Sequence, residues 1–276
     1  RVLDETLAAA RTQGMSVAIL TRLEDVDRPD DLAVLDRCWG RGAVEAVLRP
    51  VSVIVPTYNE ADVVDETLTL LLAANPAPDV IVADGGSTDG TVERAAERGV
   101  KVVTLSKAGR AAQMNAGAAR ADGAILLFLH ADTGLPCPFQ RHVRRAVRKP
   151  GFAAGAFEFR LDDAMPHYRL VERATNWRAR VLRWPYGDQA LFMTRTMFRS
   201  LGGFPEMPIM EDFEMVRRLR RRGRIAIVPA PAVTSARRWR RRGIVKTTLI
   251  NQAMIAGYLC GVSASRLAGW YGQEET

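Results

Sequence analysis

Three apolar runs, each followed at once by a polar loop that carries carboxylates, constrain this chain more than any other feature. The runs cover residues 51–55, 80–83 and 125–129. Short apolar runs bounded by polar residues are typical of strands buried in a parallel sheet. In open α/β sheets, ligands bind beyond the carboxyl ends of the strands. We therefore expect the loops Pro56–Glu60, Asp84–Gly90 and His130–Thr133 to meet at one edge of one sheet, and the function to lie there.

Helical segments alternate with these strands, as a doubly wound sheet requires. The pattern predicts helices over residues 62–73, 91–97, 111–120, 139–147 and 213–222, and further strands over 100–105 and 190–193. Pro56 ends the first strand, because proline has no N–H to donate to a central ladder. The predicted fold class is α/β, with a mostly parallel sheet flanked by helices.

Residues 1–49 precede this pattern and are predicted to form a separate N-terminal α/β extension. Their pattern predicts a helix over residues 1–13, a strand over 15–20, a helix over 29–38 and a linker over 39–42. Two interpretations stay open: an ordinary extension, or the remnant of a fused upstream domain. The second rests on residues 23–32, which resemble the tail of a nucleotidyltransferase-like GT-A domain. The main domain is expected to cover residues 50–276.

The charge of the chain is basic and comes mainly from arginine. There are 39 Lys and Arg against 31 Asp and Glu, which gives a net charge of +8. Codon bias of a GC-rich genome and a surface that meets phosphate are both consistent with this excess of arginine. Hydrophobic residues at 47% exclude a disordered chain. The three cysteines match no metal or redox spacing and favour a reducing, cytoplasmic location.

Four motifs occur in a fixed order: Val55–Glu60, Asp84–Thr91, His130–Thr133 and Glu211-Asp212. Together they resemble the ordered signature of family-2 glycosyltransferases, and most closely that of the bacterial radical-SAM/selenodomain-associated subgroup. The resemblance spans about Pro50 to Tyr271. It implies a Rossmann-like GT-A fold with acceptor-side helices at the C-terminus. The implied activity is hexosyltransferase-like: an inverting, metal-dependent transfer from a UDP- or GDP-sugar to a lipid or small-molecule hydroxyl.

The resemblance places the donor at the predicted sheet edge. Asp84 is implied to accept a hydrogen bond from the nucleotide base, although an Asp there also fixes tight turns. Asp132 matches the last carboxylate of the family's Asp-x-Asp motif, which holds Mg²⁺ or Mn²⁺ on the diphosphate. His130 stands where the family often has Asp, so its contact with metal, ribose or phosphate is left open. The other residues expected at the nucleotide sugar are Pro56, Tyr58, Glu60, Arg110, Asn115 and Arg238.

Glu211 and Asp212 open the helix that follows residue 210. Carboxylates at a helix N-terminus are stabilised by the dipole, so simple capping is one interpretation. The resemblance instead makes the pair the catalytic site, with Asp212 taking the proton of the acceptor hydroxyl and Glu211 orienting it or contacting the acceptor. The residues expected on the acceptor side are Asp188, Gln189, Gly203 and Trp239.

The arginine-rich run 237–242 partly resembles the Gln-x-x-Arg-Trp motif of processive family members. Ser235 replaces the Gln, which argues against polymer synthesis. Arg238 or a neighbouring arginine is expected to neutralise the departing nucleoside diphosphate. A solvated basic run is the alternative.

Residues 247–265 carry no charge and follow this basic run. Asn251 and Gln252 make the segment a poor membrane span. We expect an amphipathic helix on the acceptor side that touches a lipid or the inner membrane surface; a core helix is equally consistent.

Two other functions use parts of the same sequence. A nucleotidyltransferase of GT-A fold would need a Gly-rich, basic loop after the first strand, and Pro56–Glu60 is not such a loop. A non-catalytic module that binds nucleic acid or membranes would use the arginines but not Asp212. The transferase accounts for more of the motifs, and we expect no nucleic-acid partner.

Overall fold

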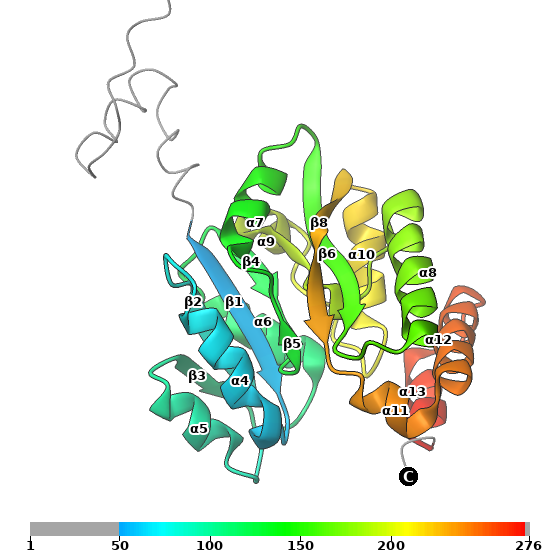
Figure 1. Cartoon of the computed structure of the whole chain (residues 1–276), viewed down its shortest axis with the longest axis horizontal. Coiled ribbons are helices and arrows are strands. Elements are labelled where there is room, and N and C mark those ends of the chain that lie inside the picture. Colours follow the sequence, from blue (N-terminus) through cyan, green and yellow to red (C-terminus); the bar gives the residue numbers. More distant parts are fainter. Residues whose placement is uncertain (1–49, 274–276) are drawn as a thin grey trace, which may run out of the picture. The chain divides into compact units, whose positions relative to one another are not determined.

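The structure is a computed structural model, and we describe its residues 50–273, apart from the side chains of Arg238 and Gln273. The elements predicted before Pro50 lie outside these residues. The described chain is built on one sheet of eight strands in the order β3-β2-β1-β4-β7-β6-β8-β5 (Figure 1).

The first half of the sheet is parallel, as predicted. It consists of β1 (Val51–Thr57), β2 (Asp79–Asp84), β3 (Lys101–Thr104) and β4 (Ile125–Phe128). The short antiparallel strand β7 (Phe192–Thr194) joins β4 to the second half. There β6 (Phe152–Leu161) and β8 (Arg224–Thr234) run parallel to each other, and β5 (Thr133–Gly134) pairs antiparallel with β8.

Helices cover both faces of the sheet. One face carries α4 (Ala61–Leu72), α5 (Thr91–Glu97) and α7 (Phe139–Val147), and the other carries α6 (Arg110–Arg120), α9 (Arg195–Ser200) and α10 (Glu211–Arg220). Strand β1 shows why its sequence is apolar throughout. Val53 and Val55 belong to the first core and Ile54 to the second, and all three side chains are fully buried. A strand covered on both faces has no solvated side.

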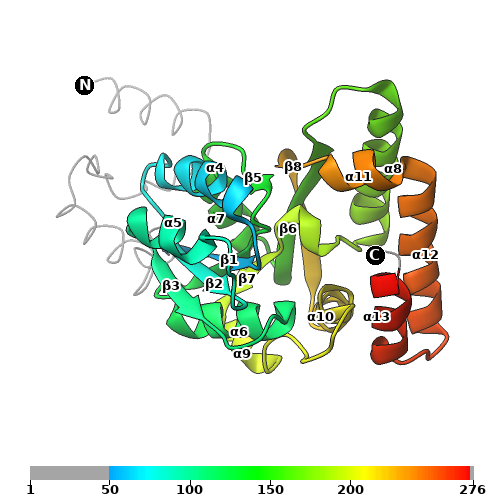
Figure 2. The same ribbon diagram turned by 90° about the horizontal axis from the view of Figure 1, so that it is seen from below.

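The remaining helices lie beside the second half of the sheet. Helix α8 (Pro166–Leu182) and α11 (Arg237–Arg242) pack against the end of β6 through Phe159, Leu161 and Tyr168. Helices α12 (Ile244–Leu259) and α13 (Ala264–Gln273) pack on α10 through Phe213, Met254 and Leu267. Figure 2 shows α11, α12 and α13 together at the end of the domain away from β3.

The predicted fold class is confirmed, and the first four predicted helices are correct to within one residue. The single helix expected over residues 247–265 is wrong. Helix α12 ends at Leu259, and the backbone turns at Gly261, whose φ of +87° belongs to the left-handed region that glycine tolerates. The sequence analysis did not predict β6, β8 or α8. Within the described range, no helix is both long enough and apolar enough to cross a membrane.

Candidate active site

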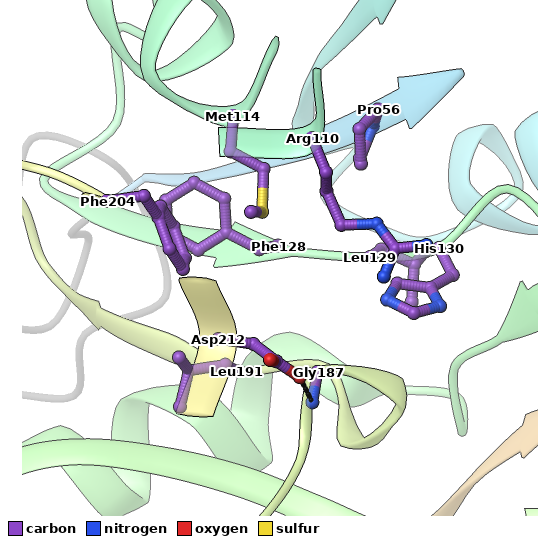
Figure 3. Close-up of a pocket in the computed structure, with 10 residues that line it drawn as sticks. All are labelled: Pro56, Arg110, Met114, Phe128, Leu129, His130, Gly187, Leu191, Phe204 and Asp212. Carbon is purple, nitrogen blue, oxygen red and sulfur yellow. Dashed lines mark hydrogen bonds between the residues drawn. The ribbon is translucent and has the colours of Figure 1, made fainter. Parts of the chain in front are cut away.

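The three predicted loops meet at one edge of the sheet. Thr57 at the end of β1 is in register with Asp84 at the end of β2. On the other side of β1, the N–H of Leu129 donates to the carbonyl of Ile54 over 2.9 Å, which places His130 and Asp132 just beyond the same edge. Helix α10, which begins at Glu211, brings Asp212 toward this edge from the second half of the chain (Figure 3).

A pocket opens where these segments converge (Figure 3). Four of its lining residues were predicted site residues: Pro56, Arg110, His130 and Asp212. The other lining residues are mostly apolar. Gly187 and Phe204 belong to the segments that carry the predicted Asp188 and Gly203, whereas the sequence analysis missed Met114, Phe128, Leu129 and Leu191. A mostly apolar cavity with a few convergent polar groups is the usual form of a small-molecule site.

Asp212 is held in a fixed orientation at the start of α10. Its Oδ2 accepts the backbone N–H of Gly187 at 2.8 Å, and its Oδ1 accepts the N–H of Phe213 at 2.7 Å. A Cβ on residue 187 would lie 2.8 Å from Asp212 Oδ2, so this approach requires glycine. The carboxylate therefore lines the pocket with little rotational freedom.

Glu211, beside it, is almost completely buried, with 5% of its surface exposed. Burial, followed by the neighbouring charge of Asp212, raises the pKa of Glu211 to about 7. Arg110 opposes this shift, with its Nε 3.9 Å from Glu211 Oε1. The motif thus holds a desolvated carboxyl next to a pocket-lining one.

Arg237 links the ends of β1 and β4, and the sequence analysis did not single it out. Its Nη2 lies 2.5 Å from Glu60 Oε2, and its Nε lies 4.0 Å from Asp132 Oδ2. Burial raises the pKa of Asp132, against the positive charges of Arg237 and Arg110. The arginine run was the available signal, but it pointed to Arg238, whose side chain lies outside the described atoms.

The carboxylate oxygens of Asp132 are the kind of donor that binds a divalent cation. Its side chain lies at the sheet edge with 20% of its surface exposed. The hydroxyl of Thr133 donates to its Oδ1 over a long distance, 3.5 Å. A desolvated carboxylate of this kind is stabilised by a cation. In the part of the chain that the structure describes, no three His, Cys, Asp or Glu side chains form a metal site. A cation here would need oxygen ligands from a substrate, which suits Mg²⁺ and Mn²⁺.

Asp84 is fully buried and binds to its own loop. Its Oδ1 accepts the hydroxyls of Thr57 and Ser87, and its Oδ2 accepts the N–H groups of Gly86 and Ser87 at 2.8 Å each. The turn-fixing role considered for Asp84 is therefore present, and its contact with a base stays a prediction. Asp89 accepts the N–H of Thr91, as expected of a capping residue.

Two more predicted residues hold the walls of the site. Asn115 exchanges two hydrogen bonds with the backbone of Phe204, at 2.8 and 2.9 Å, and lies against Gly203. Gln189 is fully buried and bonds to the backbone of Tyr186 and Phe157.

The last three predicted residues are not among those that line the pocket. Tyr58 is half exposed, and Trp239 on α11 packs on the cluster of Phe159, Leu161 and Tyr168. Asp188 lies near the partly buried Arg178, whose guanidinium carbon stacks 3.4 Å from the centre of the Tyr186 ring.

Backbone strain concentrates beside the site. Among the described residues, four other than glycine have a positive φ, and three of these flank site segments: Asn59, Ala190 and Met210. Met210, at φ +72°, directs the chain into α10 just before Glu211. Residues held in the left-handed region gather at functional sites in proteins, which supports the placement of the site here.

The comparison with protein families decides the classification. Residues 52–198, more than half of the chain, match the family model described as glycosyl transferase family 2. The chain belongs to this family. The matched range contains β1 to β7, and so the three motif loops at the sheet edge. A comparison with curated proteins found no match.

Solved structures with the same fold include several glycosyltransferases. The mannosyltransferase PcManGT from Pyrobaculum calidifontis, in complex with GDP-Man and Mn²⁺, is 23% identical with a TM-score of 0.58. The match covers 76% of this chain and 62% of that one. Glucosyl-3-phosphoglycerate synthase from Mycobacterium tuberculosis, in complex with Mn²⁺, UDP and glucosyl-3-phosphoglycerate, is 20% identical with a TM-score of 0.54, over 88% of this chain and 87% of that one.

A third structure, TarS residues 1–349 from S. aureus, is 18% identical with a TM-score of 0.54. The match covers 68% of this chain and 60% of that one. The chain thus spans about 60% of the length of PcManGT and of this TarS fragment. At these identities the similarity shows the GT-A fold.

Proposed function

We propose that this family-2 member transfers a hexosyl group from a UDP- or GDP-sugar to a hydroxyl acceptor, with inversion at the anomeric carbon. The observation that carries the proposal is the position of Asp212: its carboxylate lines a pocket at the carboxyl edge of the sheet, fixed by two backbone N–H groups. The ordered motifs also support membership in the radical-SAM/selenodomain-associated subgroup.

Asp212 is the proposed general base. The acceptor oxygen attacks the anomeric carbon, the bond from that carbon to the diphosphate oxygen breaks, and the hydroxyl proton passes to Asp212. The nucleoside diphosphate departs. The backbone hydrogen bonds that hold the carboxylate in place lower the entropic cost of reaching this geometry.

Asp132 is the residue that would hold Mg²⁺ or Mn²⁺, completed by the donor phosphates, and such an ion would offset the charge of the leaving group. PcManGT and glucosyl-3-phosphoglycerate synthase are described with Mn²⁺, which supports this assignment. Arg110, in the pocket wall, and Arg237, beside Asp132, bring the positive charge that favours a diphosphate at this edge.

The experiment is single-turnover transfer with Asp212→Asn. Asn keeps the shape of the side chain and one of its two backbone hydrogen bonds but takes no proton, so turnover is expected to fall about 10²–10⁴-fold. The affinity for UDP is expected to change little, because the diphosphate is held by other groups. Glu214→Gln is the matched control, because Glu214 lies two residues further along the same helix and pairs with Arg217 and Arg218.

Glu211→Gln separates the two carboxylates. If Glu211 orients its neighbour or contacts the acceptor, this variant loses less turnover than Asp212→Asn. If Glu211→Gln has no turnover and Asp212→Asn has nearly normal turnover, the general base is Glu211. Normal rates in both variants would leave the pair as helix-capping residues and refute the proposed mechanism.

A further inference from the structure

Helix α8 exposes a row of apolar side chains. Leu170, Ala174, Trp177 and Val181 follow each other at helical spacing and are all exposed, with Leu170 at 70% and Trp177 at 60%. At 100° per residue this row lies opposite the buried face of the same helix, which carries Tyr168, Glu172 and Ala179. Nothing in the packing of α8 on β6 uses these side chains.

Helix α12 exposes a second row. Val245, Leu249, Ala253, Ala256 and Leu259 are exposed, and the buried residues Thr247 and Met254 lie on the opposite side of the helix. Figures 1 and 2 both place α8 and α12 at the end of the domain opposite β3. Apolar side chains gathered in this way mark interaction sites.

The charge around these rows is mainly positive, although Arg240 pairs with Asp162 and Asp163, Arg180 with Glu158 and Arg237 with Glu60. Residues 235–273, which form α11 to α13, contain seven Lys and Arg and no Asp or Glu. Helix α8 contains four Arg and a single acid, Glu172. Glu172 is buried and bonded to Arg169 Nη1 at 2.6 and 2.7 Å, so it adds no negative surface.

We propose that this end of the domain, through the exposed rows of α8 and α12, docks on an anionic bilayer surface. Exposed Trp and Leu side chains insert at the boundary of headgroups and acyl chains, and the cations meet lipid phosphates. A second copy of the chain would bring two basic surfaces together, so charge complementarity favours the bilayer. The proposal does not depend on the transferase mechanism.

The test is flotation of the full chain with vesicles of phosphatidylcholine alone and with vesicles that also contain phosphatidylglycerol. We expect binding only to the second kind, weakening with salt as the screening length falls from about 10 Å at 0.1 M to about 3 Å at 1 M. Trp177→Glu combined with Leu249→Glu is expected to weaken binding at least tenfold, as a rough minimum. Arg173→Gln is expected to weaken it roughly fivefold.

Leu70→Glu is the matched control. Leu70 is also an exposed leucine, at 52%, but it lies on α4, and its substitution is expected to leave vesicle binding unchanged. Circular dichroism checks that each variant is folded, and sedimentation velocity reports self-association.

Vesicles are expected to shift the tryptophan emission of the wild type to shorter wavelength. The shift is expected to be smaller in Trp177→Phe. This measurement needs no charged substitution, so it stands even if a Glu variant fails to fold. The proposal would be overturned if the wild type did not bind vesicles that contain phosphatidylglycerol. It would also be overturned if Leu70→Glu lost as much vesicle binding as Trp177→Glu combined with Leu249→Glu. Self-association that Trp177→Glu abolishes, without vesicle binding, would assign the face to a second copy instead.

Discussion

Glu211 gives the most quantitative prediction, because its environment couples folding to pH. Burial and the charge of Asp212 raise its pKa to about 7, against an ordinary value of 4.5. Below pH 4.5 the carboxyl is protonated in both the folded and the unfolded chain, and its shift costs nothing. As the pH rises from 4.5 to 7, the unfolded chain releases the proton and the folded chain keeps it, so the folded state loses stability.

The expected magnitude follows from the two pKa values. Their difference, at about 1.4 kcal/mol per pH unit, amounts to about 3 kcal/mol once the pH exceeds 7. Glu211→Gln removes the ionisation but keeps the size of the side chain. The variant is therefore expected to gain stability relative to the wild type by about 2 to 3 kcal/mol between pH 5 and pH 8.

The assay is urea unfolding of both proteins at several pH values, with the difference in free energy of unfolding plotted against pH. Glu214→Gln is the control on the same helix. Burial tends to raise the pKa of Glu214, but hydrogen bonds from Arg217, Tyr258 and Arg218 lower it overall. The stability that the Glu214 carboxylate contributes is therefore lost only as the pH falls below the ordinary pKa of glutamate. Glu214→Gln is expected to be destabilising by a nearly constant amount from pH 5.5 to 8. A difference for Glu211→Gln that does not vary with pH would refute the assignment of a desolvated carboxyl.

Further predictions concern the metal, the core and the N-terminal residues. Asp132→Ala is expected to weaken UDP binding in the presence of Mn²⁺, measured by calorimetry, whereas Asp122→Ala, whose side chain is 81% exposed before β4, leaves it unchanged. Gly155→Ala places a Cβ against the Phe192 ring and is expected to cost about 1–3 kcal/mol in thermal unfolding. A chain that starts at Arg49 keeps the compact unit Arg49–Thr276 and is expected to retain its rate of donor hydrolysis; loss of that rate in a folded protein would show that residues 1–48 shape the site.

The first half of the fold was predictable because its signals are local. Each strand from β1 to β4 contains a short, mostly apolar run, and the helices between them carry their apolar residues at helical spacing. Strands β6 and β8 lack this signal. Arg160 interrupts the apolar sequence of β6, and Pro229 and Pro231 interrupt that of β8. The register between the two strands shifts between Phe157 and Glu158 of β6. Their pairing depends on contacts far apart in sequence, which no local pattern contains.

The candidate site was predictable where a motif supplied polar residues and not where packing supplied apolar ones. Pro56, Arg110, His130 and Asp212 were expected at the site from the motifs, and all four line the pocket. Phe128, which packs on Phe204 with ring centroids 4.8 Å apart, gives no sequence signal that distinguishes it from a core residue. Arg237 escaped prediction for another reason: in a run of arginines, only the helical geometry of α11 decides which one reaches Glu60 and Asp132.

Motif residues in this site therefore do two different kinds of work, which changes how a loss of activity is interpreted. Asp84 binds four donors, one from the end of β1 and three from its own loop, so Asp84→Ala would leave buried N–H groups unpaired and release the Gly85–Ser87 turn. A weaker affinity for UDP in that variant would follow from the displaced turn even if Asp84 never touched the base. Asp212 differs, because its two partners are backbone N–H groups that bind separate oxygens; Asn can accept one of them through its carbonyl oxygen but turns its NH2 group toward the other. A substitution at Asp212 therefore reports on chemistry where the affinity for UDP is unchanged, whereas one at Asp84 reports first on the architecture that positions the donor.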